Sequence, residues 1–382
     1  YFFEQMHMDD AIYADESIYE YPMQQGGGND GRPYSFGRPS SGGSKAAYPC
    51  KSYGQGRINP AYFYGVFDPN DMRRDVSITM TGSNGKGVEK LIPFVPNSKA
   101  EGGGLTLNKW DENRQANPWV AAQRKSGING PYMRMSEVYL GYAEVCAALG
   151  DVVTGKQYLK TVRERSFPQG LANTDAFIAS FGNDLVRAII EERGFEYAGE
   201  GDRRWTLIRS GYLPEDIKRI KDMTKAMMDG LATKGYYEFE NGNIISAYIW
   251  TKLVDAKTIY GHRLTAQCPT DKVNDPVLYP GWRGQKDNWE EMGLNYGSST
   301  PATNLAIKGL FEIVSEEEAA SLESQGYTKV NWGIDLVDNR DEYDKYLFWD
   351  YDYVSAPIYL WPFTPNVMAA GGFTNGYGFK QE

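Results

Sequence analysis

Residues 191–205 hold the densest set of groups that could do chemistry, five acids and three arginines in fifteen positions. A glycosidase needs two carboxylates about 5–10 Å apart on either side of a sugar, one of them kept protonated. Glu192, Glu196 and Glu200 are the candidates for such roles. The acids alternate with arginines, however, and opposite charges this close keep carboxylates ionised. The pattern therefore favours a salt-bridged junction between two helices over a hydrolase site, and we predict no catalytic residue.

Other catalytic patterns are weak or absent in the sequence. The only histidines, His7 and His262, lie in no HExxH motif and near no cysteine pattern. Cys50, Cys146 and Cys268 are far apart, which argues against a disulfide framework or a structural zinc site. Cys146 falls on a helical apolar stripe and is expected in the core, while a bridge between the other two stays open. There is no GxSxG elbow, no phosphate loop and no GxGxxG after a strand. We therefore expect no cofactor.

Three acid-rich loops could offer oxygen ligands to calcium: residues 68–71, 335–341 and 350–352. None has the DxDxDG spacing of a calcium-binding loop. Because Asp and Asn are common turn residues, a turn-forming role is favoured. No metal site is predicted.

Aromatic residues are the remaining candidates for function. The chain has 28 Tyr, 16 Phe and 9 Trp, 14% of its residues. Tyrosine and tryptophan combine an apolar ring with a polar group, so exposed rings can stack on sugars while neighbouring polar side chains bind the hydroxyls. The predicted ligand-binding residues are Tyr34, Phe36, Tyr53, Tyr62, Tyr64, Trp110 and Trp119. A core position is the alternative, above all for Tyr62 and Tyr64, which lie in an apolar run.

Charge and hydropathy exclude several partner classes. The net charge is -10 and the pI is about 5.0, whereas nucleic-acid binding needs a basic surface. No run of about 20 apolar residues could span a membrane. The first residues have neither the basic nor the apolar region of a signal peptide, so we expect the chain to begin inside a larger protein.

The clearest helix signal lies in residues 131–149. Apolar residues recur there at steps of four, three, four and three, which predicts one buried helical face: Met135, Tyr139, Tyr142, Cys146 and Leu149. Pro131 at the start and Gly150 after the end fit helix termini. With a helix over 155–165, this segment forms a predicted helical hairpin.

Further elements follow from periodicity and turn residues. A strand is expected over 17–21, with an aromatic run at 60–67 and a half-buried strand toward residue 80. Further helices are expected over 174–193, 200–210, 214–229 and 300–312. The predicted fold class is mainly α, with tetratricopeptide-like helical hairpins, a loop-rich irregular subdomain and a few short strands. The expected regions are 1–125 (strand and long loops, ligand-facing), 126–213 (helices) and 214–382 (loop-rich).

Several segments together resemble the SusD/RagB family. The resemblance lies in residues 16–20, 68–73, 133–144, 159–165 and 192–209. The last segment is similar in length and order to the family's "E-R-x-x-E-L-A-G-E-G-x-R-W" stretch, which is structural in that family. Residues 360–366 are similar to the family's closing stretch, but they carry Phe363 where that stretch has an isoleucine and Asn366 where it has an acid.

The resemblance implies a non-catalytic nutrient-binding protein of Bacteroidetes. Such a protein sits on the outer face of the outer membrane through a lipid anchor that lies outside this chain. It delivers oligosaccharide to a SusC-like TonB-dependent transporter. The resemblance carries no ligand residues over, because the ligand platform of the family has no fixed motif. Alternatives are a peptide ligand within the same family, a carbohydrate-active hydrolase, or a structural partner of the transporter without a ligand.

Overall fold

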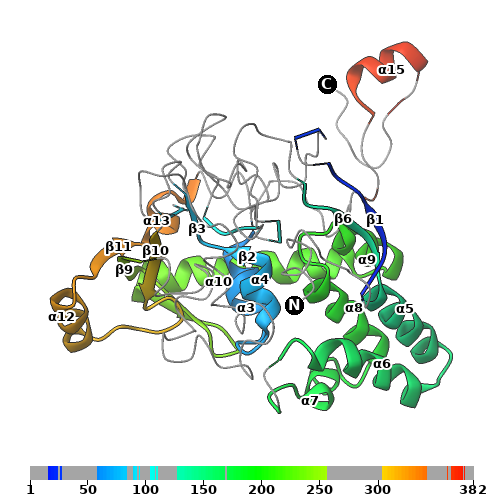
Figure 1. Ribbon diagram of the computed structural model, residues 1–382, viewed down its shortest axis with the longest axis horizontal. Helices are drawn as coiled ribbons and strands as arrows, with labels where there is room; N and C mark the ends of the chain where they lie inside the picture. The colour runs from blue at the N-terminus through cyan, green and yellow to red at the C-terminus, as the bar shows by residue number, and fades with distance from the viewer. Residues whose placement is uncertain are drawn as a thin grey trace.

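The computed structural model describes residues 16–24, 26–27, 58–83, 89–92, 94, 104–107, 109–110, 127–167, 170–255, 303–341, 359, 363–372 and 374. Its helices are α3 (Pro60–Gly65), α4 (Met72–Ser77), α5 (Met135–Ala148), α6 (Val152–Glu164), α7 (Thr174–Ala179), α8 (Leu185–Glu196), α9 (Asp202–Ser210), α10 (Leu213–Lys234), α12 (Glu316–Ser324), α13 (Gly333–Asp338) and α15 (Pro365–Gly371). Helices α5, α6 and α7 gather at one end, the sheet with α12 and α13 lies at the other, and α10 runs between them (Figure 1).

The strands are short and form small antiparallel sheets. They are β1 (Ser17–Tyr21), β2 (Ile78–Thr79), β3 (Thr81–Ser83), β4 (Glu89–Leu91), β5 (Thr106–Leu107), β6 (Gly130–Arg134), β7 (Tyr236–Glu238), β8 (Ile244–Ser246), β9 (Tyr248–Asp255), β10 (Thr303–Lys308) and β11 (Thr328–Asn331). The described pairs are β1–β6, β2–β5, β3–β4 and β7–β8, and β9 lies between β10 and β11. The predicted fold class, mainly α with a few short strands, is confirmed.

Helices α5 and α6 form the predicted hairpin. Gly150 turns the chain with a φ of 86°, and the Asp151 side chain accepts the amide of Thr154 to begin α6. Apolar side chains of both helices meet α8 in one core: Leu140, Ala143, Leu159, Val162, Leu185, Ala188 and Ile189. Packing against α8 therefore fixes the hairpin.

The buried face of α5 differs from the predicted one. Cys146 is buried as expected, but Tyr142 is 50% exposed and Leu149 is 82% exposed. The helix also begins only at Met135, because the preceding residues pair with β1 as strand β6. Since α5 carries apolar residues on two faces, periodicity alone could not tell which face packs inward.

The predicted helix over 174–193 is two helices. Gly182 and Asn183 both have a φ of 65°, which interrupts the helix, and Asp184 caps α8 by accepting the amide of Arg187. Both helices still pack into the same core. The prediction of one continuous helix over 174–193 was therefore wrong.

Helix α10, with 22 residues and a length of about 33 Å, links the two ends of the molecule. Its apolar residues Met227, Met228 and Leu231 pack in a second core with α3 and the β9–β10–β11 sheet. The predicted helix over 300–312 was wrong, because strand β10 occupies 303–308. Its Leu305 and Ile307 are buried in this core, where pairing with β9 outweighs the local helical pattern.

Candidate functional site

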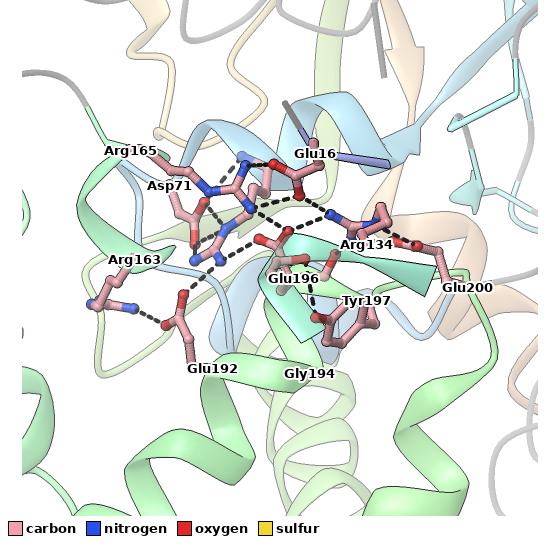
Figure 2. Close-up of polar contacts among 12 residues, drawn as sticks. Glu16, Asp71, Arg134, Arg163, Arg165, Glu192, Gly194, Glu196, Tyr197 and Glu200 are labelled. Carbon is pink, nitrogen blue, oxygen red and sulfur yellow. Dashed lines mark hydrogen bonds and ion pairs between the residues drawn. The ribbon is translucent and has the colours of Figure 1, made fainter. Parts of the chain in front are cut away.

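The acid-rich segment forms a buried ionic network at the end of α8. Glu192 and Glu196 lie one helical turn apart, and Glu200 follows in the turn after the helix. Glu192 is fully buried and Glu196 is 5% exposed. Figure 2 shows their carboxylates pointing toward basic side chains from α4, α6 and β6. The network therefore joins segments far apart in sequence.

Glu196 lies at the centre of this network. Its Oε1 accepts Arg165 Nη2 at 2.6 Å and Arg134 Nη1 at 2.7 Å, and its Oε2 accepts Arg73 Nη1 at 3.1 Å. Burial alone would raise the pKa of Glu196, but Arg165, Arg134 and Arg73 outweigh it and hold the pKa well below its usual range. The carboxyl group is therefore ionised at neutral pH.

Glu192 and Glu200 are held in the same way. Glu192 accepts Arg73 Nη1 at 2.6 Å and Arg163 Nη1 at 2.9 Å. Glu200 Oε1 accepts Lys109 Nζ at 2.6 Å and Arg134 Nη2 at 2.8 Å. A general acid must be protonated and face a substrate, whereas these oxygens face arginine and lysine.

A second ionic cluster lies on the other side of α8. Glu191 accepts Arg203 Nη2 at 3.0 Å, and Asp216 of α10 accepts Arg203 Nη2 at 2.9 Å and Arg219 Nη2 at 2.6 Å. Burial would raise the pKa of Asp216, but Arg203 and Arg219 lower it overall. This cluster fits the predicted salt-bridged junction between helices, because it ties α8 to α9 and α10.

The network also fastens strand β1. Glu16 accepts Arg134 Nη1 at 2.6 Å and Arg165 Nη1 at 2.9 Å, and its carbonyl accepts the amide of Met135 at 2.7 Å. Arg134 is the last residue of β6 and is 2% exposed. One end of the β1–β6 pair is therefore anchored to α6 and α8 (Figure 2).

Three predicted ligand-binding aromatics lie among the described residues: Tyr64 and Trp110 are buried, and Tyr62 is half-buried against the core. Tyr64 is fully buried, with its hydroxyl accepting Trp332 Nε1 at 2.8 Å. Tyr62 donates its hydroxyl to Gly194 O at 3.0 Å, and burial raises its pKa. Trp110 is 3% exposed. Buried rings present no face to a ligand, so the core alternative fits Tyr64 and Trp110 better.

The other four predicted residues, Tyr34, Phe36, Tyr53 and Trp119, lie outside the described residues. The exposed aromatics that the structure does describe were not among those predicted. They include Tyr132 (70% exposed), Tyr19 (59%) and Tyr21 (58%) on the β1–β6 pair. The tyrosine-rich strand at 17–21 was the available signal, but only its pairing with β6 brings Tyr19 and Tyr132 together.

The acids of the first acid-rich loop, residues 68–71, bond nearby groups of their own segment. Asp68 Oδ1 accepts the amide of Asn70 at 2.8 Å, and Asp71 caps α4 and bonds Arg73, so both acids have local roles. Within the described ranges, no three His, Cys, Asp or Glu side chains are arranged to hold a metal. Residues 350–352 lie outside those ranges. None of the described helices is long and apolar enough to cross a membrane.

The chain is similar to several known proteins. SusD-like protein P25 of Formosa agariphila is 28% identical over 160 residues, 42% of this chain and 26% of that protein. A SusD homologue from Bacteroides thetaiotaomicron is 20% identical with a TM-score of 0.41, covering 58% of this chain and 45% of that one. Surface glycan-binding protein A of the same species, solved with laminarihexaose, is 18% identical with a TM-score of 0.39, covering 56% and 46%. The chain thus spans less than half the length of these relatives.

A helical hairpin packed on α8, a buried ionic network and a few short strands define a mainly α protein. The sequence profile of the SusD family matches residues 11–362. This chain belongs to the SusD family, and the resemblance read from its sequence is confirmed.

Proposed function

We propose that the chain is part of a non-catalytic cell-surface protein that binds an oligosaccharide and delivers it to a TonB-dependent outer-membrane transporter. The observation that carries the proposal is the family match over residues 11–362. Family membership also supports a position on the extracellular face of the outer membrane of a Bacteroidetes cell. The transporter is then SusC-like, and a lipid anchor outside this chain holds the protein to the membrane.

The ionic network supports binding rather than hydrolysis. Glu192, Glu196 and Glu200 are the acids that the sequence offers as candidates for hydrolysis, and each is bonded to arginine or lysine. Retaining and inverting glycosidases both need one carboxyl that can donate a proton. Arg165, Arg134 and Arg73 hold the pKa of the Glu196 carboxyl well below its usual range, so this group cannot donate a proton at neutral pH.

The ligand contacts remain proposals. Tyr34, Phe36, Tyr53 and Trp119 stay candidates for stacking on sugar rings, since tyrosine and tryptophan suit half-exposed binding surfaces. Oligosaccharide is the favoured ligand. Peptide is the alternative, and an experiment must distinguish the two. A binding site of this kind needs no cofactor.

Calorimetric titration of the purified chain tests the ligand class. The probes are laminarihexaose, maltohexaose, cellohexaose, xylohexaose and a set of short peptides. We expect measurable affinity for at least one oligosaccharide and unchanged oligosaccharide after prolonged incubation. Binding of peptides but of no oligosaccharide would show that the ligand is a peptide. If the chain released shorter sugars and Glu200→Gln abolished this release, the chain would be a hydrolase and the proposed function would be wrong.

A further inference from the structure

The β1–β6 pair carries the most exposed tyrosines that the structure describes. Tyr132 is 70% exposed, Tyr19 is 59% exposed and Tyr21 is 58% exposed. Large aromatic side chains usually bury most of their surface in cores or interfaces. Three solvent-exposed rings on one two-stranded ribbon therefore indicate a surface that binds a ligand or a partner.

Two of these rings form a defined corner. The centroids of Tyr19 and Tyr132 are 5.8 Å apart and their planes meet at 84°. Edge-to-face contact of this kind is favourable for aromatic pairs and restrains both side chains. Within the described part of the chain, neither phenol hydroxyl has a hydrogen-bond partner. The corner thus offers two ring faces at a right angle with two free hydroxyls.

The ribbon beneath the corner is fastened at both ends. Glu16 and Arg134 tie one end to the ionic network. At the other end, Asn129 Nδ2 donates to Glu20 Oε2 at 2.9 Å, and Asn129 Oδ1 accepts the amide of Met23 at 2.9 Å. An isolated two-stranded ribbon is marginally stable in water, so these anchors supply the rigidity. A preorganised corner binds with a smaller entropic cost.

We propose that the Tyr19–Tyr132 corner is a sugar-stacking subsite, which names a site for the proposed oligosaccharide function and rests on that function. A sugar ring has an apolar C–H face and a polar edge of hydroxyls. The phenol ring matches both, with its apolar face and its hydroxyl. A stable protein interface takes about 20–30 residues on each side, whereas the ribbon exposes only a handful of side chains. Its size therefore fits a small ligand.

Alanine and phenylalanine variants of the corner test this subsite in the intact chain. The probe is whichever hexasaccharide of the panel binds the unmodified protein. We expect Tyr132→Ala and Tyr19→Ala each to weaken its affinity about tenfold or more. Tyr132→Phe keeps the ring and should retain most of the affinity. Tyr142→Ala removes a ring that is 50% exposed on α5, outside the corner, and should leave the affinity unchanged.

The results of these measurements distinguish a failure of the subsite from a failure of the proposed function. Circular dichroism first establishes that each variant is folded. Alanine variants that are folded and bind the hexasaccharide as tightly as the unmodified chain overturn the subsite alone. An equal loss of affinity in Tyr142→Ala also overturns it. An unmodified chain that binds no oligosaccharide overturns the proposed function and the subsite with it.

Discussion

Glu196 lies in a sequence pattern that suggests catalysis, but in the structure its carboxylate holds arginines of the fold in place. Its two oxygens accept hydrogen bonds from Arg73 of α4, Arg134 of β6 and Arg165, which follows α6. Taking a carboxylate out of water is costly unless hydrogen bonds and opposite charges compensate it. Here they do, and the compensation leaves the carboxylate unable to donate a proton at neutral pH.

Replacing Glu196 tests this structural role. Glu196→Gln leaves buried Arg134, half-buried Arg73 and exposed Arg165 without their shared anion, so we expect the free energy of unfolding to fall by about 3–5 kcal/mol. Urea denaturation measures the change. Asp222→Asn is the matched control, because it removes an exposed partner of Lys218 and should change stability by less than about 0.5 kcal/mol. Equal stability of the two variants would contradict the role.

Tyr64 gives the corresponding test for the core aromatics. Tyr64→Phe keeps the ring but leaves the buried Trp332 Nε1 without its acceptor. We expect a loss of about 1–3 kcal/mol in the free energy of unfolding, with the oligosaccharide affinity unchanged. Thermal or urea denaturation and calorimetric titration measure the two effects. A loss of affinity without a loss of stability would show that Tyr64 contacts the ligand.

At the scale of elements, the ionic network holds strand β1 in place. Glu16 links β1 to Arg134 of β6 and to Arg165 after α6. A short strand with exposed tyrosines has little apolar burial of its own. The strand should therefore depend on these charges more than helix α10 does, which buries apolar residues in the main core.

Hydrogen exchange can measure this dependence. Glu16→Gln weakens the link to both arginines, so we expect faster exchange of the amides of β1 and β6. The amides of α10 should keep their protection. Glu215→Gln, which alters a carboxylate that is 64% exposed, serves as control and should change neither region. Unchanged exchange in β1 would show that strand pairing alone holds it.

Most helices and the structural role of the acid cluster could both be predicted from the sequence, but for different reasons. Helices α6, α9 and α10 follow from local periodicity with Gly and Asp at their ends, which are local properties. The pairing of the acids was expected from neighbouring arginines, and Arg203 does bond Glu191. The arginines that bond Glu192 and Glu196 come from distant segments, which no local pattern reveals.

Failures of prediction arose where tertiary contacts outweigh local patterns. Strand β10 was expected to be helical, but its place beside β9 decides its structure. Tyr62 and Tyr64 were proposed for binding because their composition fits a ligand surface. Composition does not show which side a ring faces: Tyr64 is buried in the core, and Tyr62 is half-buried against it.

For the whole molecule, the lowered pKa values predict a loss of stability in acid. The folded pKa values of Glu196 and Asp216 lie below their usual values, so unfolding takes up protons when the pH is low. Their contribution is fully present above the unfolded values of about 4 and is lost as the pH falls through the folded values. Urea denaturation at pH 7, 5, 4 and 3 should show little change above pH 5 and a steady fall below pH 4. A smaller fall is expected in Glu196→Gln, and constant stability down to pH 3 would contradict the pairing.

The proposed function, that this SusD-family chain binds an oligosaccharide without cleaving it, can be tested in a single sample. The most direct measurement follows one sample by calorimetry and by mass analysis of the sugar, using the hexasaccharide panel and the folded chain. We expect saturable binding of at least one hexasaccharide, with the same hexasaccharide recovered intact after prolonged incubation. Shorter sugars released by the unmodified chain and not by Glu200→Gln, or no binding to any hexasaccharide, would contradict it.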